Sequence, residues 1–127
     1  MIHLDTGFLI RALVLGSPEY ASLRDWLGRG EPLGISSIAW AEFLCGSLSS
    51  DAPAMVRRIV GDPIPFDAEQ AERAAALFNN SGRRRGTLAD CMVAAAALEA
   101  DAALATSNSA DFRRLEGHGL RLVAGRG

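Results

Sequence analysis

The chain has 127 residues, of which 49% are hydrophobic and 22% are charged, as is typical of one globular domain and not of a disordered chain. We expect a single domain over residues 1–127 in the cytoplasm, because charged residues interrupt every apolar run before it reaches the ~18–20 residues of a membrane-spanning helix. The net charge of −2 excludes a polycation that coats nucleic acid by bulk attraction.

Hydrophobic patterning predicts short apolar strands that alternate with helices. In chain order, we predict a strand at 2–5, helices at 6–15 and 18–27 and a strand at 32–36. There follow a helix that carries residues 38–44 and is capped by Ser36 or Ser37, a helix at 54–60 and an extended link at 62–65. The last elements are helices at 68–78 and 88–100, a strand at 102–105, a short helix within 107–115 and a strand at 120–123. Loops are predicted at 47–53 and 79–86, with a frayed end at 125–127.

Polar residues support several of the predicted helix starts. Ser17 precedes a proline at the first helical position, and Asp67 and Gln70 have the spacing of a capping box. Thr87 stands before the most apolar helix, where it is expected to be the N-cap. Glu19, like most of the acids, is expected at a cap or on a solvated helix face.

The alternation of strands and helices predicts one α/β domain, a three-layer α/β/α sandwich with a short, mainly parallel central sheet. In such sheets, ligands bind beyond the carboxyl ends of the strands, at the point where the strand order reverses. Side chains that directly follow a strand are therefore the first candidates for a functional site.

The residue types exclude several catalytic chemistries. All 13 basic residues are arginine, so Schiff-base chemistry, Walker-type phosphate binding and Ser–Lys catalysis lack their lysine. Cys45 and Cys91 are far apart in apolar surroundings, which predicts two reduced core thiols. The only histidines are His3 and His118, and no nucleophile motif accompanies them. Carboxylates remain as the main chemical resource.

Three carboxylates occur where a carboxylate is costly. Asp5 ends the first strand, while Glu42 and Asp90 lie in helices that are apolar around nearly their whole circumference, which predicts burial. Burying an unpaired carboxylate costs several kcal/mol or forces protonation. A fourth acid, Asp111, follows the strand at 102–105. If the four converge, hard oxygen ligands without histidine or cysteine indicate Mg²⁺ or Mn²⁺.

Each of these acids also has a structural explanation, which stays open at this point. Asp5 can cap the helix that follows it, and Glu42 can pair with Arg11. Asp90 and Asp111 can lie in the first turns of helices, where the helix dipole favours a negative charge.

Four motifs, in this order, resemble the PIN domain, and most closely the VapC-type toxin of bacterial toxin–antitoxin pairs. They are Ile-x-Leu-Asp-Thr from residue 2, Trp-Ala-Glu-Phe from residue 40, Leu-Ala-Asp from residue 88 and Thr-x-Asn-x-x-Asp-Phe from residue 106. The resemblance covers nearly the whole chain. It implies an acidic quartet of catalytic groups and metal ligands, namely Asp5, Glu42, Asp90 and Asp111. It also implies supporting polar residues, namely Thr6, Thr106 and Asn108.

The resemblance further implies a Mg²⁺-dependent endoribonuclease, for which Mn²⁺ is an alternative ion. In this mechanism metal-activated water attacks an RNA phosphorus in line and leaves 5′-phosphate and 3′-hydroxyl ends. As the toxin of a pair, the chain is expected to form a homodimer, to be inhibited by a cognate antitoxin protein and to have no membrane partner. Phosphate contacts are expected from basic residues near the acids, namely Arg83, Arg84, Arg85 and Arg113.

Three other functions compete with this interpretation. A receiver-like signalling module also has an acidic Mg²⁺ pocket, but its pattern includes a lysine that this chain lacks. A PIN-fold module without activity, serving only in assembly, and a non-toxin PIN nuclease of RNA processing both stay open.

Overall fold

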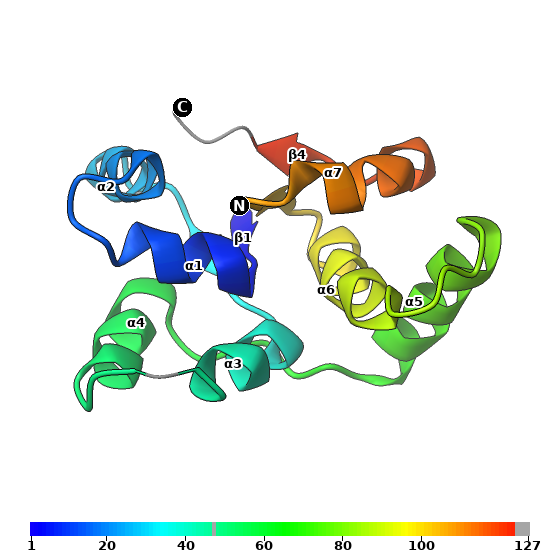
Figure 1. The fold of residues 1–127 in the computed structure, drawn as a ribbon, viewed down its shortest axis with the longest axis horizontal. Coiled ribbons are helices and arrows are strands. Elements are labelled where there is room, and N and C mark those ends of the chain that lie inside the picture. Colours follow the sequence, from blue (N-terminus) through cyan, green and yellow to red (C-terminus); the bar gives the residue numbers. More distant parts are fainter. Residues whose placement is uncertain (47, 124–127) are drawn as a thin grey trace.

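A computed structural model describes residues 1–46 and 48–123 and shows an α/β fold (Figure 1). The predicted frayed end at 125–127, and residue 47 of the predicted loop at 47–53, lie outside the described residues. Along the described chain the elements are β1 (Ile2–Leu4), α1 (Thr6–Ala12), α2 (Pro18–Gly28), β2 (Leu33–Gly34), α3 (Ser37–Leu44), α4 (Ala52–Val60), α5 (Ala68–Asn80), α6 (Leu88–Glu99), β3 (Ala103–Ala105), α7 (Ser109–Phe112), the 3₁₀ helix η1 (Arg113–His118) and β4 (Leu122–Val123).

The four strands of the sheet are all parallel, in the spatial order β2-β1-β3-β4. In the register of the central strands, Ile2 of β1 lies opposite Leu33 of β2 and Ala103 of β3. The chain continues from β1 to β2 on one side and later to β3 on the other, so the strand order reverses between β1 and β3. The carboxyl ends of these two strands therefore define the expected place for a ligand.

The predicted α/β architecture with a parallel sheet is confirmed. Figure 1 shows α1 and α2 on one side of β1, with α5 and α6 on the other. The strand predicted at 32–36 contains only two residues, because the chain leaves β1 after Gly34 and pairs with the predicted extended link instead. There Ser36 and Ile64 form an isolated parallel bridge, in which the Ile64 amide donates to the Ile35 carbonyl at 2.8 Å.

Most of the predicted N-caps are confirmed by side-chain hydrogen bonds. Ser17 accepts from the Tyr20 amide at 2.9 Å, and Asp67 accepts from the Gln70 amide at 2.9 Å. Thr87 does stand at the N-cap position of α6, but its hydroxyl donates to the Arg84 carbonyl and makes no capping bond. Thr87 is therefore the N-cap residue, as predicted, but its side chain does not accept the expected hydrogen bond from an amide of the first turn of α6.

Much of α6 belongs to the core, as its apolar sequence predicts. Its buried residues include Cys91, Val93 and the four alanines at 94–97, all of which have an exposed fraction of 0–4%. Alanine has no long side chain, so α6 can approach its neighbours closely, and it contacts α3, α5, α7 and β3. Cys45 contradicts the prediction of two core thiols, because it is exposed at the end of α3.

His3 is a buried histidine in the middle of β1, with an exposed fraction of 1%. Its register partner in β2 is Gly34, and a Cβ atom at Gly34 would lie 3.1 Å from His3 Cδ2 and 3.2 Å from His3 Nε2. The imidazole thus fills the space that a larger residue at 34 would need. Burial, and then the positive charge of the N-terminus, lower the pKa of His3 to about 4, so the ring is neutral at pH 7.

We expect His3 to make folding stability depend on pH in acid. The folded-state pKa of about 4 lies below the ordinary histidine value of 6.5, so the unfolded state binds the proton more tightly between these values. Stability is therefore lost as the pH falls from 6.5 to 4, by roughly 3 kcal/mol in total. Urea unfolding at several pH values in this window should show a smaller loss for His3→Val. Equal slopes for the two proteins would contradict the assignment, since all other titrating groups are common to both.

Among the described residues, no helix is both long enough and apolar enough to cross a lipid bilayer.

Candidate acidic site at the carboxyl end of the sheet

A small polar pocket lies at the carboxyl ends of β1 and β3, where the strand order reverses. It is lined by Asp5, Thr6, Gly7, Glu42, Asp90, Val93, Asn108, Asp111 and Phe112. The four acids that the sequence singles out thus line one pocket, although they come from four different elements. Its volume of about 130 Å³ is well below the ~300–1,000 Å³ of pockets for small organic ligands. The size suits an ion with its water, or one phosphate group.

Asp5 is the most firmly held of the four carboxylates. It directly follows β1, has an exposed fraction of 6%, and its Oδ1 accepts a hydrogen bond from the Phe8 amide at 2.7 Å as the N-cap of α1. Burial raises the pKa of Asp5 and the negative charge of Asp111 adds to this, while hydrogen bonds from Thr106 and Phe8 oppose it. Asp5 therefore both caps α1, as its structural explanation predicts, and lines the acidic pocket.

Asp90 and Asp111 face the same pocket from α6 and α7. Asp90 is half-buried in the first turn of α6, and Asp111 is exposed in the first turn of α7, as their helix-dipole explanation requires. The pKa of Asp90 is raised, first by burial and then by the charge of Asp111, with smaller contributions from Glu42 and Asp5. The carboxylates therefore act on one another electrostatically across the pocket.

Glu42 is exposed, which contradicts its predicted burial. Only Ala39 and Phe43 of α3 are buried. The helix is apolar on nearly every side, but only one side of it is covered by other elements. Glu42 also does not pair with Arg11. Its Oε1 lies 3.4 Å from the Thr6 hydroxyl oxygen, which makes a shorter contact of 2.9 Å to the Ala39 carbonyl. Because Thr6 has one hydroxyl proton, the bond to Ala39 is the stronger of the two.

The donor set of the pocket fits a hard divalent cation. Its lining offers four carboxylates, one hydroxyl and one amide, and includes no basic side chain. In their present rotamers, no three acidic, histidine or cysteine side chains of the described residues are arranged to hold one ion together. Uncompensated carboxylates repel one another. Glu42 and Asp111 are exposed and so have the freedom to rotate toward a shared cation.

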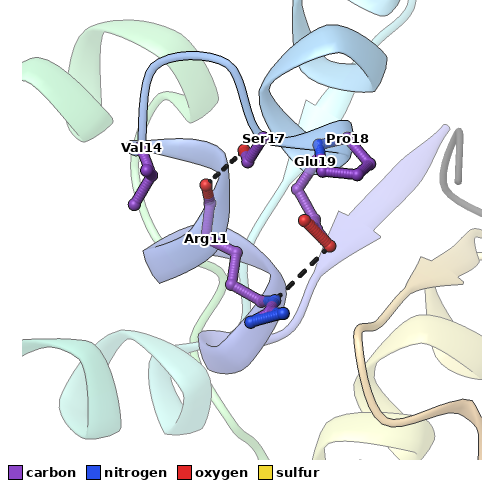
Figure 2. Close-up of a pocket in the computed structure, with 5 residues that line it drawn as sticks. All are labelled: Arg11, Val14, Ser17, Pro18 and Glu19. Atoms are coloured by element: carbon purple, nitrogen blue, oxygen red, sulfur yellow. Dashed lines mark hydrogen bonds and ion pairs between the residues drawn. The ribbon is translucent and has the colours of Figure 1, made fainter.

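The loop after β3 is held by contacts that sequence reasoning missed. Thr106 is buried, and its hydroxyl oxygen accepts from the Asn108 amide at 3.0 Å. Ser107 donates to Glu19 Oε2 at 3.3 Å, and Glu19 also pairs with Arg11 at 3.6 Å. Figure 2 shows Arg11 and Glu19 lining a second hollow between α1 and α2.

Glu19 therefore corrects an expectation, because its side chain is only 14% exposed instead of solvated. It ties α1 and α2 to the loop that carries Asn108 and leads into α7 with Asp111. Glu19 and Ser107 are 88 positions apart, so no local pattern in the sequence could have paired them.

The arginines proposed for phosphate contacts have different surroundings from the acids. The residues of the triplet, Arg83, Arg84 and Arg85, are exposed on the turn between α5 and α6, and none of them lines the pocket. Arg113 is also exposed, at the start of η1. The neighbouring Arg114 differs, because its Nε and Nη2 are buried and its charge lowers the pKa of Asp90.

Comparison with known proteins identifies the family of the chain. The model of one protein family, described as the PIN domain, matches residues 2–117. No curated protein sequence gives a significant match.

Solved structures with a similar fold include several that come from toxin–antitoxin complexes. A toxin–antitoxin complex from Klebsiella pneumoniae has a chain 24% identical, with a TM-score of 0.74 over 98% of this chain and 97% of that one. A chain of VapBC2 from Rickettsia felis, bound to a promoter DNA fragment, is 24% identical, with a TM-score of 0.76 over 97% and 98%. A chain of VapBC-1 from nontypeable Haemophilus influenzae is 23% identical, with a TM-score of 0.73 over 97% of each chain. These likenesses show a shared fold.

Proposed function

Because the chain belongs to the PIN domain family, we propose that it is a metal-dependent endoribonuclease, a single PIN domain whose acidic pocket is the active site. The observation that carries this proposal is the convergence of Asp5, Glu42, Asp90 and Asp111 on one small pocket with no basic lining residue. Such a donor set supports Mg²⁺, with Mn²⁺ as the alternative. When bound, the cation supplies an acidified water molecule and offsets negative charge on the phosphate.

The residues of the chain would divide the remaining work. Asp5 and Asp90 are proposed as direct cation ligands, because the first is fixed by its capping bond and the second by the first turn of a buried helix. Asp111 would bind the ion directly or through water. Glu42, exposed at the rim beside Thr6, would bind the ion or orient the attacking water. The substrate RNA would meet the four acids from the open side of the pocket.

The supporting polar residues would orient these groups. Thr106 hydrogen-bonds the Asp5 carboxylate and holds the Asn108 amide, so it links the ends of β1 and β3. Thr6 and Asn108 line the pocket and would orient carboxylates or substrate. Arg83, Arg84, Arg85 and Arg113 remain proposals for contacts with RNA phosphates, where their exposure leaves them accessible.

We further propose that the chain is the toxin of a toxin–antitoxin pair. The support is the shared fold with chains from toxin–antitoxin complexes, over nearly the full length of both chains. A cognate antitoxin protein is then the expected partner and inhibitor, and a homodimer is the expected assembly. The expected place of action is the cytoplasm.

Expression in a bacterial host tests this function. The wild-type chain is expected to arrest growth, and co-expression of the neighbouring gene product is expected to relieve the arrest. Asp90→Asn should not arrest growth at equal protein level, whereas Glu72→Gln, an exposed acid of α5 outside the pocket, should arrest it like the wild type.

The growth test, combined with an RNA cleavage assay on the purified chain, separates the competing functions. Growth without arrest, together with no cleavage of RNA by the purified chain, would indicate a PIN-fold module that serves only in assembly. RNA cleavage without arrest would instead indicate a nuclease of RNA processing.

A further inference from the structure

Glu19 joins the loop after β3 to α1, although it belongs to α2. Its Oε2 accepts a hydrogen bond from the Ser107 hydroxyl at 3.3 Å and pairs with Arg11 Nε at 3.6 Å, so one carboxylate oxygen meets both partners. Figure 2 shows the pair of Arg11 and Glu19 at the hollow between α1 and α2. Three elements that are separate in the sequence are thus joined through a single side chain.

The loop after β3 and the first turn of α1 both line the acidic pocket, through Asn108 and Gly7. A Cβ atom at Gly7 would lie 3.7 Å from Asn108 Nδ2 and 3.8 Å from Asp5 Oδ1, so the loop packs closely on this turn beside the first acid. Arg11 follows Gly7 by four residues, which places it one helical turn further along the same side of α1. The ion pair with Glu19 therefore lies next to the place where the loop meets α1 at the pocket.

Ser107 is the residue before Asn108, so its hydrogen bond to Glu19 acts on the part of the loop that lines the pocket. The other hydrogen bonds of this part are local. The Asn108 backbone amide donates to the Thr106 hydroxyl oxygen at 3.0 Å, and the Asp111 backbone amide donates to the Asn108 carbonyl at 3.0 Å. These local bonds set the shape of the loop, and the bond to Glu19 holds it on the side of α1 and α2.

Glu19 also has a simpler explanation, because the helix dipole stabilises a carboxylate in the first turn of a helix and Glu19 is the second residue of α2. Glu69 has the same position in α5 and is exposed to solvent. The dipole thus does not require the carboxylate to turn inward, yet the Glu19 side chain is only 14% exposed. The contacts with Ser107 and Arg11 explain its inward direction.

We infer that Glu19 is a positioning residue, which holds the loop after β3 against α1 and so places Asn108 at the acidic pocket. Asp111, which follows in α7, is positioned through the same loop. The inference rests on the proposed function, because it takes the pocket as the active site. Glu19 is not among the residues that line the pocket, so it acts on cleavage only through the loop.

Amide hydrogen exchange of the full chain in EDTA, followed by NMR, tests the inference without any metal. In Glu19→Ala, the backbone amides of Asn108 and Asp111 should exchange roughly tenfold faster, because loss of a hydrogen bond to a charged group makes local opening of the loop easier. Ser107→Ala removes the other partner of the same bond and should have the same effect. The two substitutions together should add little to either one alone.

Glu69→Ala is the matched control, because it removes an exposed acid from the same position of another helix, and it should leave these exchange rates unchanged. Unchanged exchange at Asn108 and Asp111 in either Glu19→Ala or Ser107→Ala would overturn the inference. A rise by the same factor at the amides of α5 would also overturn it, since it would indicate a general loss of stability.

Cleavage kinetics test the consequence for catalysis. In saturating Mg²⁺, Glu19→Ala should lower kcat roughly tenfold and leave KM for RNA unchanged, as expected when a supporting residue is lost. Glu19→Gln retains an acceptor for the Ser107 hydroxyl and should recover most of the rate. An unchanged kcat, or a raised KM in its place, would overturn the positioning role. If the wild-type chain does not cleave RNA, the proposed function fails, while the exchange rates in EDTA still decide whether Glu19 holds the loop.

Discussion

Asp90→Asn is expected to abolish RNA cleavage and, in the absence of divalent cations, to raise the thermal stability of the protein. Loss of a residue that only supports a metal ligand commonly costs 10–100-fold, so loss of a proposed ligand should lower the cleavage rate at least ~100-fold. The stability change has the opposite sign, because burial and the charge of Asp111 raise the pKa of Asp90. A carboxylate whose folded-state pKa is raised destabilises the fold above that pKa, and neutral asparagine removes this cost.

The Tm of Asp90→Asn in EDTA should exceed that of the wild type by about 3 °C, measured by circular dichroism or differential scanning fluorimetry at pH 7. Asp5→Asn is the informative companion, because asparagine can still cap α1 through the bond to the Phe8 amide. It should also lose cleavage without unfolding. Glu72→Gln, outside the pocket, should change neither quantity. Full cleavage by Asp90→Asn, or a fall in its Tm, would contradict the proposed site.

The acids at strand ends were the most predictable part of the site. Asp5 directly follows an apolar strand, and Asp111 follows another, so parallel pairing of β1 with β3 brings both to the same edge. This prediction needs only the strand assignments and the rule that ligands bind at carboxyl ends. The parallel sheet itself was predicted from the alternation of short apolar strands with helices.

Burial of helical residues was less predictable, as α3 and α6 illustrate. Both are apolar on nearly every side, but α6 buries Cys91 and the five residues at 93–97, whereas α3 buries only Ala39 and Phe43 and leaves Glu42 exposed. Composition reports which faces can be buried, whereas the tertiary packing decides which faces are covered. Glu42 therefore lines the pocket from its exposed rim and not from the buried core, as had been predicted.

Side chains that support the site were not predictable from local patterns. Glu19 contacts Ser107 across 88 positions. Arg114 was not separable from Arg113 in sequence, since only the geometry of η1 turns one guanidinium inward and leaves its neighbour in solvent. Such contacts depend on the final arrangement of α2, α7 and η1, which short-range spacing does not encode.

Removal of divalent cations is expected to eliminate RNA cleavage by the wild-type chain. The pocket is lined by four carboxylates and no basic residue, so without a cation it repels a phosphate and has no group to acidify water. We expect EDTA to lower the rate at least ~100-fold, as for loss of a ligand. Excess Mg²⁺ or Mn²⁺ should restore it, whereas NaCl at the same ionic strength should not.

The decisive measurement is the initial rate of cleavage of a fluorescently labelled RNA by purified wild-type chain, as a function of Mg²⁺ concentration from EDTA upward. A cation site formed by Asp5, Glu42, Asp90 and Asp111 predicts no cleavage in EDTA and a rate that rises with Mg²⁺ to saturation. Cleavage that proceeds at the same rate in EDTA as in saturating Mg²⁺ would contradict a metal-dependent nuclease at this pocket.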